Sequence, residues 1–198
     1  MDKELSRKYF NEKASTWDAT IRNNHSKQLN SMAKRIDILP DDWVLDVGTG
    51  TGIFLPYISQ FVNGSGKIIC IDYAINMLLL AFQKKVPADI TFICSEIETL
   101  SLFSNMFDRV ICYASFPHFH DKPNALQNIH RMMKPAASLY ICHTASRQAI
   151  NTLHLDIPGF DDHLIPDQPT MKTLLREANF SDILIQEETD SYFVTAIK

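Results

Sequence analysis

Residues 44–52 read Val44-Leu45-Asp46-Val47-Gly48-Thr49-Gly50-Thr51-Gly52, an apolar run that passes directly into a glycine-rich stretch. Three of the six glycines of the chain fall in this window. Glycine is needed where a chain turns tightly and where its backbone must touch a ligand. Because a helical pattern begins at about Ile53, the stretch predicts a strand, a ligand-binding loop and a helix in succession.

Short β-rich runs alternate with helical patterns from Val44 to Ile141. This alternation is typical of βαβ units that build a parallel sheet. The runs are nearly continuous in apolar residues, as expected for strands that helices cover on both faces. We therefore expect an α/β fold with helices on both sides of the sheet. The predicted strands of this part are 43–47, 67–71, 89–94, 107–112 and 138–142, and the predicted helices begin at about 53 and span 74–85 and 123–133.

The two ends of the chain depart from this alternation. A predicted helix over 169–178 leads into an apolar run over 182–187, and a short Asp190-Ser191 turn separates this run from another over 192–197. Two strands joined so tightly must be antiparallel. Helical patterns, including 26–38, precede the first strand and are too short for a separate domain. We expect a single domain over 1–198, made of a helical cap (1–40), a core (41–143) and a final segment (144–198).

Composition narrows the classes of protein to which the chain can belong. The 198 residues are 45% hydrophobic and 21% charged, which is the profile of a globular domain. The net charge is −4 and the basic residues form no run, so nucleic acid is not an expected partner. The charged first residues, and the lack of an apolar run of about 18 residues, predict a soluble, cytoplasmic protein that does not enter a membrane. Each of the four cysteines follows an isoleucine in an apolar run, as is typical of core residues in a reducing compartment.

Three carboxylates accompany the predicted strands at one edge of the sheet. Asp46 opens the glycine loop, Asp72 ends the second strand 24 residues beyond Gly48, and Glu96 follows the third strand. A carboxylate at the position of Asp72 can accept hydrogen bonds from both hydroxyls of a ribose. Together the three would form an acidic mouth that suits a cationic nucleoside and repels a pyrophosphate. The glycine spacing also disfavours a nicotinamide-dependent oxidoreductase, because Ile53 stands where the last glycine of the dinucleotide pattern would be.

In these motifs the sequence resembles the class I S-adenosylmethionine-dependent methyltransferases. The resemblance covers about residues 9 to 198, and its motifs are 44–52, Ile71-Asp72-Tyr73-Ala74, Phe107-Asp108-Arg109-Val110-Ile111 and Arg131-Met132-Met133-Lys134-Pro135. It implies a Rossmann-like three-layer sandwich whose seven-stranded sheet has the order 3-2-1-4-5-7-6, with the last strand antiparallel. It also implies S-adenosylmethionine as the cofactor, bound by the core segment. Pro135-Ala136-Ala137 stands where the family usually has Pro-Gly-Gly, which concerns the local backbone geometry of that turn.

The resemblance also implies which residues hold the cofactor. Asp46 and the loop glycines would hold its methionine end, Asp72 would bind the ribose, and Tyr113 would lie near the sulfonium. Tyr73, Glu96 and Ile97 would surround the adenine. The complete predicted set is Asp46, Gly48, Thr49, Gly50, Gly52, Asp72, Tyr73, Glu96, Ile97 and Tyr113. The alternatives are that the two aspartates are cap or turn residues, that Glu96 is a solvated loop carboxylate and that Tyr113 is a core aromatic.

Histidines gather on the predicted substrate side. His118 and His120 follow the fourth strand and His143 ends the fifth, so all three converge on the edge where open α/β sheets bind ligands. Histidine has a suitable pKa for a general base, and His118 or His143 is the catalytic candidate if the acceptor must lose a proton. One alternative is that these histidines only cap strands and loops. Another is that they bind a divalent metal together with His154 or His163.

Aromatic side chains and a long irregular segment complete the predicted site. Phe10, Trp17, Phe116 and Phe119 either wall an apolar acceptor pocket or belong to the core, and the segment 151–169 would cover the pocket. The resulting hypothesis is methyl transfer to a small-molecule acceptor by in-line displacement. The motifs indicate which cofactor is bound but not whether a reaction follows. A module that binds S-adenosylmethionine without transferring its methyl group therefore remains an alternative.

Overall fold

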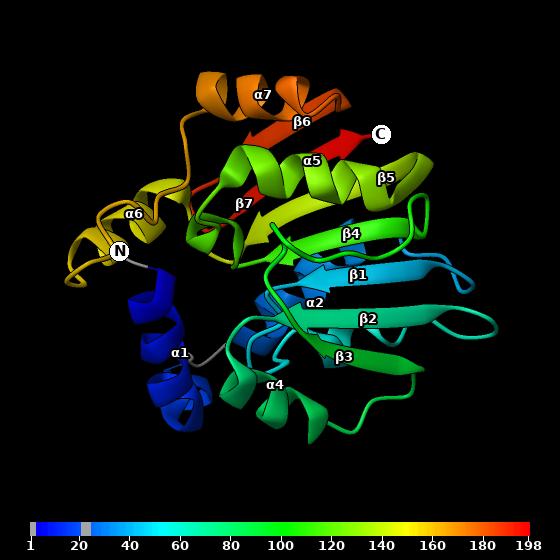
Figure 1. The fold of residues 1–198 in the computed structure, drawn as a ribbon, viewed down its shortest axis with the longest axis horizontal. Helices are drawn as coiled ribbons and strands as arrows, with labels where there is room; N and C mark the ends of the chain where they lie inside the picture. Colours follow the sequence, from blue (N-terminus) through cyan, green and yellow to red (C-terminus); the bar gives the residue numbers. More distant parts are fainter. Residues whose placement is uncertain (1–2, 21–24) are drawn as a thin grey trace.

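The strands form one mixed sheet in the order expected from the resemblance. The computed structural model describes residues 3–20 and 25–198, and within them the sheet has seven strands in the order β3-β2-β1-β4-β5-β7-β6 (Figure 1). Neighbouring strands from β3 to β5 pair in parallel, and β7 is antiparallel to both β5 and β6. The strands are β1 (Trp43–Val47), β2 (Lys67–Asp72), β3 (Ile90–Cys94), β4 (Phe107–Tyr113), β5 (Met133–His143), β6 (Ser181–Glu187) and β7 (Tyr192–Ile197).

Helices cover both faces of the sheet because successive side chains of a buried strand point to opposite sides. Leu45 of β1 belongs to the core that α5 (Lys122–Met132) and α7 (Gln168–Glu177) close on one face. Its neighbour Val44 belongs to the core that α2 (His25–Arg35), α3 (Leu55–Ile58) and α4 (Ile75–Phe82) close on the other. Figure 1 shows α5 in front of the sheet and α2 behind it. The result is the three-layer sandwich that the sequence predicts.

Two further helices lie at one end of the sandwich. Figure 1 shows α1 (Lys3–Trp17) and α6 (Arg147–Leu155) at the left, past the ends of β1 and β4. Helix α1 docks on α4, where Asn11 Oδ1 accepts a hydrogen bond of 2.9 Å from the Asn76 backbone N–H. The predicted cap over 1–40 thus contains α1, a 3₁₀ turn (Asp18–Thr20) and α2, while residues 1–2 and 21–24 of that range lie outside the described residues. No helix in the described part of the chain is long and apolar enough to cross a membrane.

Helix α6 was not predicted, and an irregular segment was expected from residue 151 onward. Only Ile150 and His154 are buried on it, whereas Leu153 and Leu155 are exposed. Ser146 starts the helix, since its hydroxyl accepts a hydrogen bond of 3.2 Å from the Ala149 backbone N–H. Other differences are small: α3 begins two residues after the predicted start, α4 ends at Phe82 and not at Lys85, and β5 begins at Met133 and not at Ser138.

The early start of β5 contains an irregularity at the turn where the family usually has glycines. Phe107 pairs with Met133, but Arg109 already pairs with Ser138, so β5 bulges between these two pairs. Within the bulge Ala136 has a φ of 61°, and its backbone N–H donates to the Lys198 carbonyl oxygen at 3.2 Å. A side chain in this left-handed conformation costs roughly 1–2 kcal/mol. The departure from Pro-Gly-Gly therefore strains the backbone at Ala136.

Replacing Ala136 by glycine is expected to stabilise the protein. The substitution removes the strain at the positive φ of Ala136, which outweighs the greater freedom that glycine gives to the unfolded chain. The free energy of unfolding should rise by about 0.5–1 kcal/mol, measured by urea denaturation. The matched control is Ala137→Gly in the same strand, where φ is not positive and glycine should lower the stability. Equal effects of the two substitutions would contradict this account.

Candidate active site

A cavity of about 340 Å³ lies at the carboxyl ends of the parallel strands, where open α/β sheets bind ligands. It is enclosed by the loop after β1, the segments that follow β2 to β5, and the helices α1 and α6. Its volume falls at the lower end of the range of about 300–1,000 Å³ that is typical of small-molecule sites. Among the ten predicted cofactor-binding residues, those that line the cavity are Gly48, Thr49, Gly50, Asp72, Tyr73, Glu96, Ile97 and Tyr113.

The glycine loop is pinned to the neighbouring strand and opens toward the cavity. The backbone N–H groups of Gly48 and Thr49 both donate to the Ile71 carbonyl oxygen, at 2.8 and 3.0 Å. Gly48 and Gly50 have φ values of 69° and 57°. A Cβ atom on Gly50 would meet no protein atom within 4 Å, so this backbone faces free space. The loop therefore leaves its main chain accessible to a ligand at Gly50.

The other two glycines of the loop serve packing. A Cβ atom on Gly48 would lie 2.4 Å from the Ser115 Cβ atom, and one on Gly52 would lie 2.9 Å from the Ala81 Cβ atom. Gly52 does not line the cavity. Glycine is thus required at Gly48 by the end of β4 and at Gly52 by helix α4, and the predicted role of Gly52 in binding is indirect.

Asp72 points from the end of β2 into the glycine loop. One carboxylate oxygen accepts from the Gly50 backbone N–H at 2.8 Å, and the other accepts from the Ala74 backbone N–H at 2.8 Å. Burial raises the pKa of this carboxyl to about 6 despite these hydrogen bonds. A carboxylate has about four acceptor sites, and the Tyr73 backbone N–H is a third donor to it, so one site remains for a hydroxyl of a ligand in the cavity. Asp72 can therefore bind a ribose. It also accepts from the Ala74 N–H, as expected if it were only a cap or turn residue.

Asp46 is placed differently from the prediction. Its side chain is buried, does not line the cavity and accepts a hydrogen bond of 2.9 Å from the Thr49 hydroxyl. Burial raises the pKa of Asp46 to about 7, while the Thr49 hydrogen bond opposes this rise. Asp46 therefore shapes the loop through Thr49 and does not itself face the cavity.

The contribution of Asp46 to the stability of the ligand-free protein is expected to fall between pH 4 and pH 7, against the opposite contribution of the buried histidines. With a pKa of about 7 in the folded chain and 3.8 ordinarily, its carboxyl keeps a proton on folding that the unfolded chain has already released. Rising pH therefore favours unfolding, by about 1.4 kcal/mol for each pH unit within this window. Asp46→Asn should remove this contribution, so that the difference in urea stability between the variant and the wild type grows from pH 4 to pH 7 and is then constant. A difference that is constant throughout would refute the assignment.

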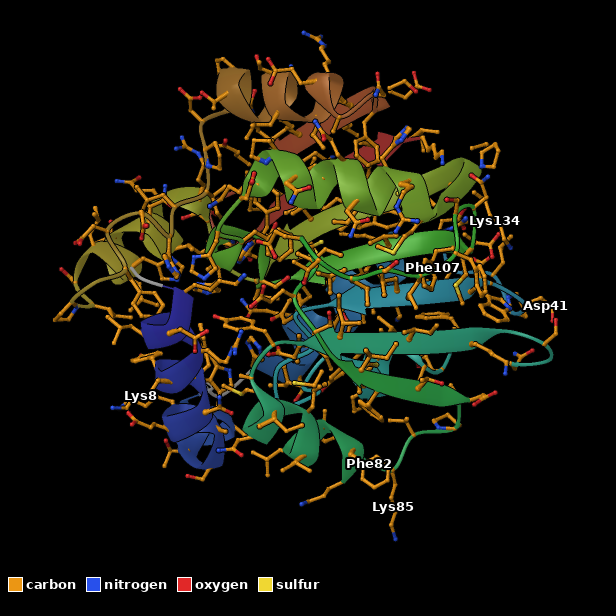
Figure 2. The ribbon with its side chains drawn as sticks, in the orientation of Figure 1. Lys8, Asp41, Phe82, Lys85, Phe107 and Lys134 are labelled. Carbon is orange, nitrogen blue, oxygen red and sulfur yellow. The ribbon has the colours of Figure 1, made fainter. Side chains whose placement is uncertain are left out.

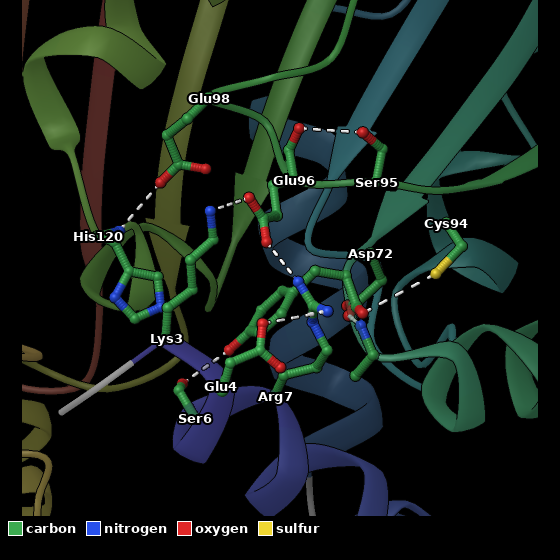
Figure 3. A network of polar contacts seen from close by, with 12 residues as sticks. Lys3, Glu4, Ser6, Arg7, Asp72, Cys94, Ser95, Glu96, Glu98 and His120 are labelled. Atoms are coloured by element: carbon green, nitrogen blue, oxygen red, sulfur yellow. Dashed lines mark hydrogen bonds and ion pairs between the residues drawn. The ribbon is translucent and has the colours of Figure 1, made fainter.

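Glu96 is bound by the N-terminal helix. Figure 3 shows Lys3 and Arg7 reaching from α1 to its carboxylate, and the Arg7 guanidinium lies 2.6 Å from one of its oxygens. Burial alone would raise the pKa of Glu96, but the hydrogen bonds from Lys3 and Arg7 hold it below its ordinary value. Of the three carboxylates expected to form an acidic mouth, Asp72 and Glu96 line the cavity, and Glu96 is ion-paired there, whereas Asp46 is buried beneath the loop. The network ties α1 over the cavity.

Two tyrosines are held by hydrogen bonds that the sequence did not indicate. The Tyr73 hydroxyl lies 2.8 Å from the Ser6 hydroxyl of α1. The Tyr113 hydroxyl, at the end of β4, lies 3.0 Å from the Thr144 hydroxyl and 3.2 Å from His25 Nε2. His25 also lines the cavity and is a site residue that sequence reasoning missed. It is separated from Tyr113 by 88 positions, and nothing in its own segment marks it.

The far half of the cavity is aromatic. Phe10 and Trp17 of α1 line it together with Phe119, and the predicted cover contributes Leu153, His154, Ile157 and Phe160. Phe116 is fully buried in the core and does not line the cavity, so it is not one of the pocket walls. The part of the segment 151–169 up to Phe160 therefore forms one wall of the cavity.

Histidines provide most of the polar groups in this half. His118, His120, His143 and His154 line the cavity. Burial lowers the pKa of His118 well below its ordinary value and that of His143 to about 3, so both imidazoles are neutral at physiological pH. His143 Nε2 is buried without a hydrogen-bond partner. No group of three histidine, cysteine or acidic side chains in the described ranges 3–20 and 25–198 is arranged to hold a metal ion, so the geometry gives no support to the metal alternative.

Comparison with known proteins identifies the family. The family model of a methyltransferase domain matches residues 45–141, which contain the glycine loop and the strands around the cavity. The chain belongs to the class I S-adenosylmethionine-dependent methyltransferases. The crystal structure of an S-adenosylmethionine-dependent methyltransferase from Aquifex aeolicus shares the fold, with a TM-score of 0.71. The two chains are 22% identical, and the match covers 93% of this chain and 97% of that one.

Curated methyltransferases are similar in sequence. The chain is 33% identical over 116 residues to a malonyl-[acyl-carrier protein] O-methyltransferase of Anoxybacillus flavithermus, a match that covers 59% of this chain and 43% of that protein. It is 25% identical over 181 residues to the ubiquinone/menaquinone biosynthesis C-methyltransferase of Escherichia coli. This match covers 77% of this chain and 69% of that protein. The chain thus spans less than half the length of the first of these methyltransferases.

Proposed function

We propose that the protein transfers a methyl group from S-adenosylmethionine to a small acceptor that carries no anionic group. The observation that carries this proposal is the composition of the cavity. Its near half consists of the glycine loop and Asp72, and its far half consists of aromatic and imidazole side chains. No lysine or arginine is among the described residues that line it.

The near half fits the cofactor of the family. The open backbone at Gly50 and the remaining acceptor capacity of Asp72 match the methionine and ribose portions of S-adenosylmethionine. When bound, this cofactor supplies a methyl group on a positively charged sulfur. Tyr73 and Ile97 would flank the adenine, and Tyr113 would face the sulfur from the end of β4.

The far half would hold the acceptor. Methyl transfer is an in-line displacement, and much of its rate enhancement comes from holding the reacting atoms at near-attack distance. The aromatic walls from α1 and the cover segment would pack against a flat, apolar body. His118 is the group proposed to take a proton from the acceptor, because it lines the cavity at the end of the segment that follows β4. His143, held neutral by burial, would serve as a hydrogen-bonding group.

Charge restricts the acceptor. Asp72 and Glu98 line the cavity, and the cations of Lys3 and Arg7 are engaged by Glu96. An anionic group placed there would lose its hydration without gaining a lysine or arginine partner, which is unfavourable. Neutral imidazoles accept or donate hydrogen bonds, so a neutral acceptor with an O–H, N–H or S–H group fits the site best.

The test is a turnover assay with purified protein and S-adenosylmethionine. Neutral phenols, aromatic amines and aromatic thiols would each be paired with their carboxylated analogues, and formation of S-adenosylhomocysteine would be measured. We expect turnover of neutral members, with kcat/KM at least about 10-fold lower for the carboxylated ones, since leaving a charge unpaired costs upwards of about 1.4 kcal/mol. Preference for the carboxylated members would contradict the charge argument. Saturable cofactor binding with no turnover on any acceptor would favour the non-catalytic module.

A further inference from the structure

Three imidazoles and one carboxylate form a chain of contacts from the cavity to the surface. His118 ends a 3₁₀ turn (Phe116–His118), His154 lies on α6, and His163 follows α6 in the cover segment. His118 Nδ1 lies 2.8 Å from His163 Nδ1. His163 Nε2 in turn lies 3.6 Å from a carboxylate oxygen of Asp162, whose side chain is 66% exposed. His163 itself is buried and does not line the cavity, so it connects His118 to the surface carboxylate.

The contact between the two Nδ1 atoms requires one proton, because a hydrogen bond needs one donor and one acceptor. The negative charge of Asp162, 3.6 Å from His163 Nε2, favours a proton on that nitrogen. A neutral His163 with its proton there has a lone pair on Nδ1. His118 must then carry its proton on Nδ1 and donate it to His163. The lone pair of His118 is thereby left on Nε2.

His118 Nε2 is available to a ligand. It makes no hydrogen bond with the described residues, and it is not among the buried atoms without a partner. Since His118 lines the cavity, this lone pair opens toward the acceptor half. The tautomer set by His163 and Asp162 is therefore the one that a proton-accepting His118 needs.

We propose that His163 is a positioning residue that holds His118 as its Nδ1–H tautomer and relays the proton of the acceptor toward Asp162. This inference rests on the proposed function. As the acceptor atom forms its bond to the methyl group, and the electron pair of the old carbon–sulfur bond stays on sulfur, the acceptor proton moves to His118 Nε2. The Nδ1 proton of His118 passes to His163 Nδ1, and the Nε2 proton of His163 passes to Asp162 or water. No oxidant, reductant or further reactant is needed.

The surroundings of His118 explain why its proton would have to be passed on. The groups that face it are Phe10 of α1, Lys122 of α5, His143 of β5, His154 of α6 and Phe160 of the cover segment. None of them is an anion, so an imidazolium at His118 would be unfavourable and would not persist. A contact that passes the charge to an exposed carboxylate removes this difficulty.

His154 provides an internal reference for the tautomers. Its Nδ1 atom contacts the His163 carbonyl oxygen, which can only accept a hydrogen bond. His154 is therefore an Nδ1–H tautomer whatever the state of the other two rings. A measurement that reads all three rings at once can be checked against it.

The test is a long-range ¹H–¹⁵N correlation spectrum of the full-length protein with ¹⁵N-labelled histidine, recorded near pH 7.5 with S-adenosylhomocysteine added. We expect the proton on Nδ1 in His118 and His154 and on Nε2 in His163. A proton on Nε2 of His118 would overturn the proposal. Because the spectrum needs no acceptor, its result is independent of turnover: correct tautomers without methyl transfer would leave the positioning role supported and the proposed function refuted.

Two variants separate positioning from simple structure. His163→Asn retains an oxygen that can accept from His118 but cannot relay a proton, so the His118 tautomer should persist while kcat on a neutral acceptor from the turnover assay falls about 100-fold and KM changes little. Asp162→Asn, which removes the negative charge beside His163 Nε2, should shift His163 and His118 toward the opposite tautomers. His130→Asn on α5, where the ring packs on Phe180 away from the cavity, is the control and should change neither. Unchanged kcat in His163→Asn would exclude the relay.

Discussion

Replacing Asp72 by alanine is expected to weaken the binding of S-adenosylhomocysteine about 100-fold. The carboxylate holds the Gly50 and Ala74 backbone N–H groups and is proposed to accept from the ribose as well. Hydrogen bonds to a charged group each contribute roughly 1.5–3 kcal/mol, and the loop would also lose the group that orders it. Titration calorimetry with the ligand-free protein measures the effect directly.

The matched control for this variant is Asp108→Ala. Asp108 is another strand aspartate that accepts from a backbone N–H, that of Trp43 at 2.9 Å, and it also binds Lys134 at 2.7 Å. Figure 2 shows Lys134 at the end of the sheet opposite to α1. Asp108→Ala should therefore lower stability without changing affinity. An Asp72→Ala protein that is folded and binds within threefold of the wild type would remove Asp72 from the site.

Replacing Gly48 by alanine is expected to lower the free energy of unfolding by about 3–5 kcal/mol. The left-handed backbone contributes roughly 1–2 kcal/mol of this, and the overlap of the new methyl group with the Ser115 Cβ atom contributes the remainder. Gly50→Ala is the matched comparison, because its φ is also positive but its Cβ would meet no protein atom within 4 Å. It should lose only the backbone contribution in urea denaturation.

A double-mutant cycle isolates the overlap. Ser115→Gly removes the Cβ atom that the methyl group of Gly48→Ala would meet, at the loss of the Ser115 hydrogen bond to the Val47 carbonyl oxygen. Combined with Gly48→Ala it should restore part of the stability, with a favourable coupling of about 1–3 kcal/mol. Strict additivity of the two substitutions would show that the end of β4 is not what requires glycine at Gly48.

The sheet could be predicted from the sequence because each strand is marked by a pattern within its own short segment. Each central strand is a short apolar run, and the glycine loop and Asp72 follow directly from two of these runs. The rule that ligands bind at the carboxyl ends of parallel strands then brings both to the same place. The antiparallel end of the sheet followed from the short turn between β6 and β7 for the same reason.

The parts that escaped prediction depend on contacts between distant segments. His25 meets Tyr113 and Arg7 meets Glu96 across 88 and 89 positions, and no pattern within either segment indicates such a pair. Helix α6 was missed because it buries only one narrow strip. Asp46 was expected at the cavity, but a neighbouring hydroxyl, that of Thr49, holds its carboxylate beneath the loop.

The ion pairs between α1 and Glu96 also determine when α1 can dock while the chain is being synthesised. Arg7 leaves the ribosome 89 residues before the carboxylate that it binds, a delay of roughly 5–20 s at ordinary rates of translation. During this interval α1 lacks these docking contacts, since Tyr73 and Asn76, which also form hydrogen bonds with it, are made later as well. Helix α1 can therefore dock only after β3 and the residues that follow it have emerged, and its side of the cavity stays open to water until then.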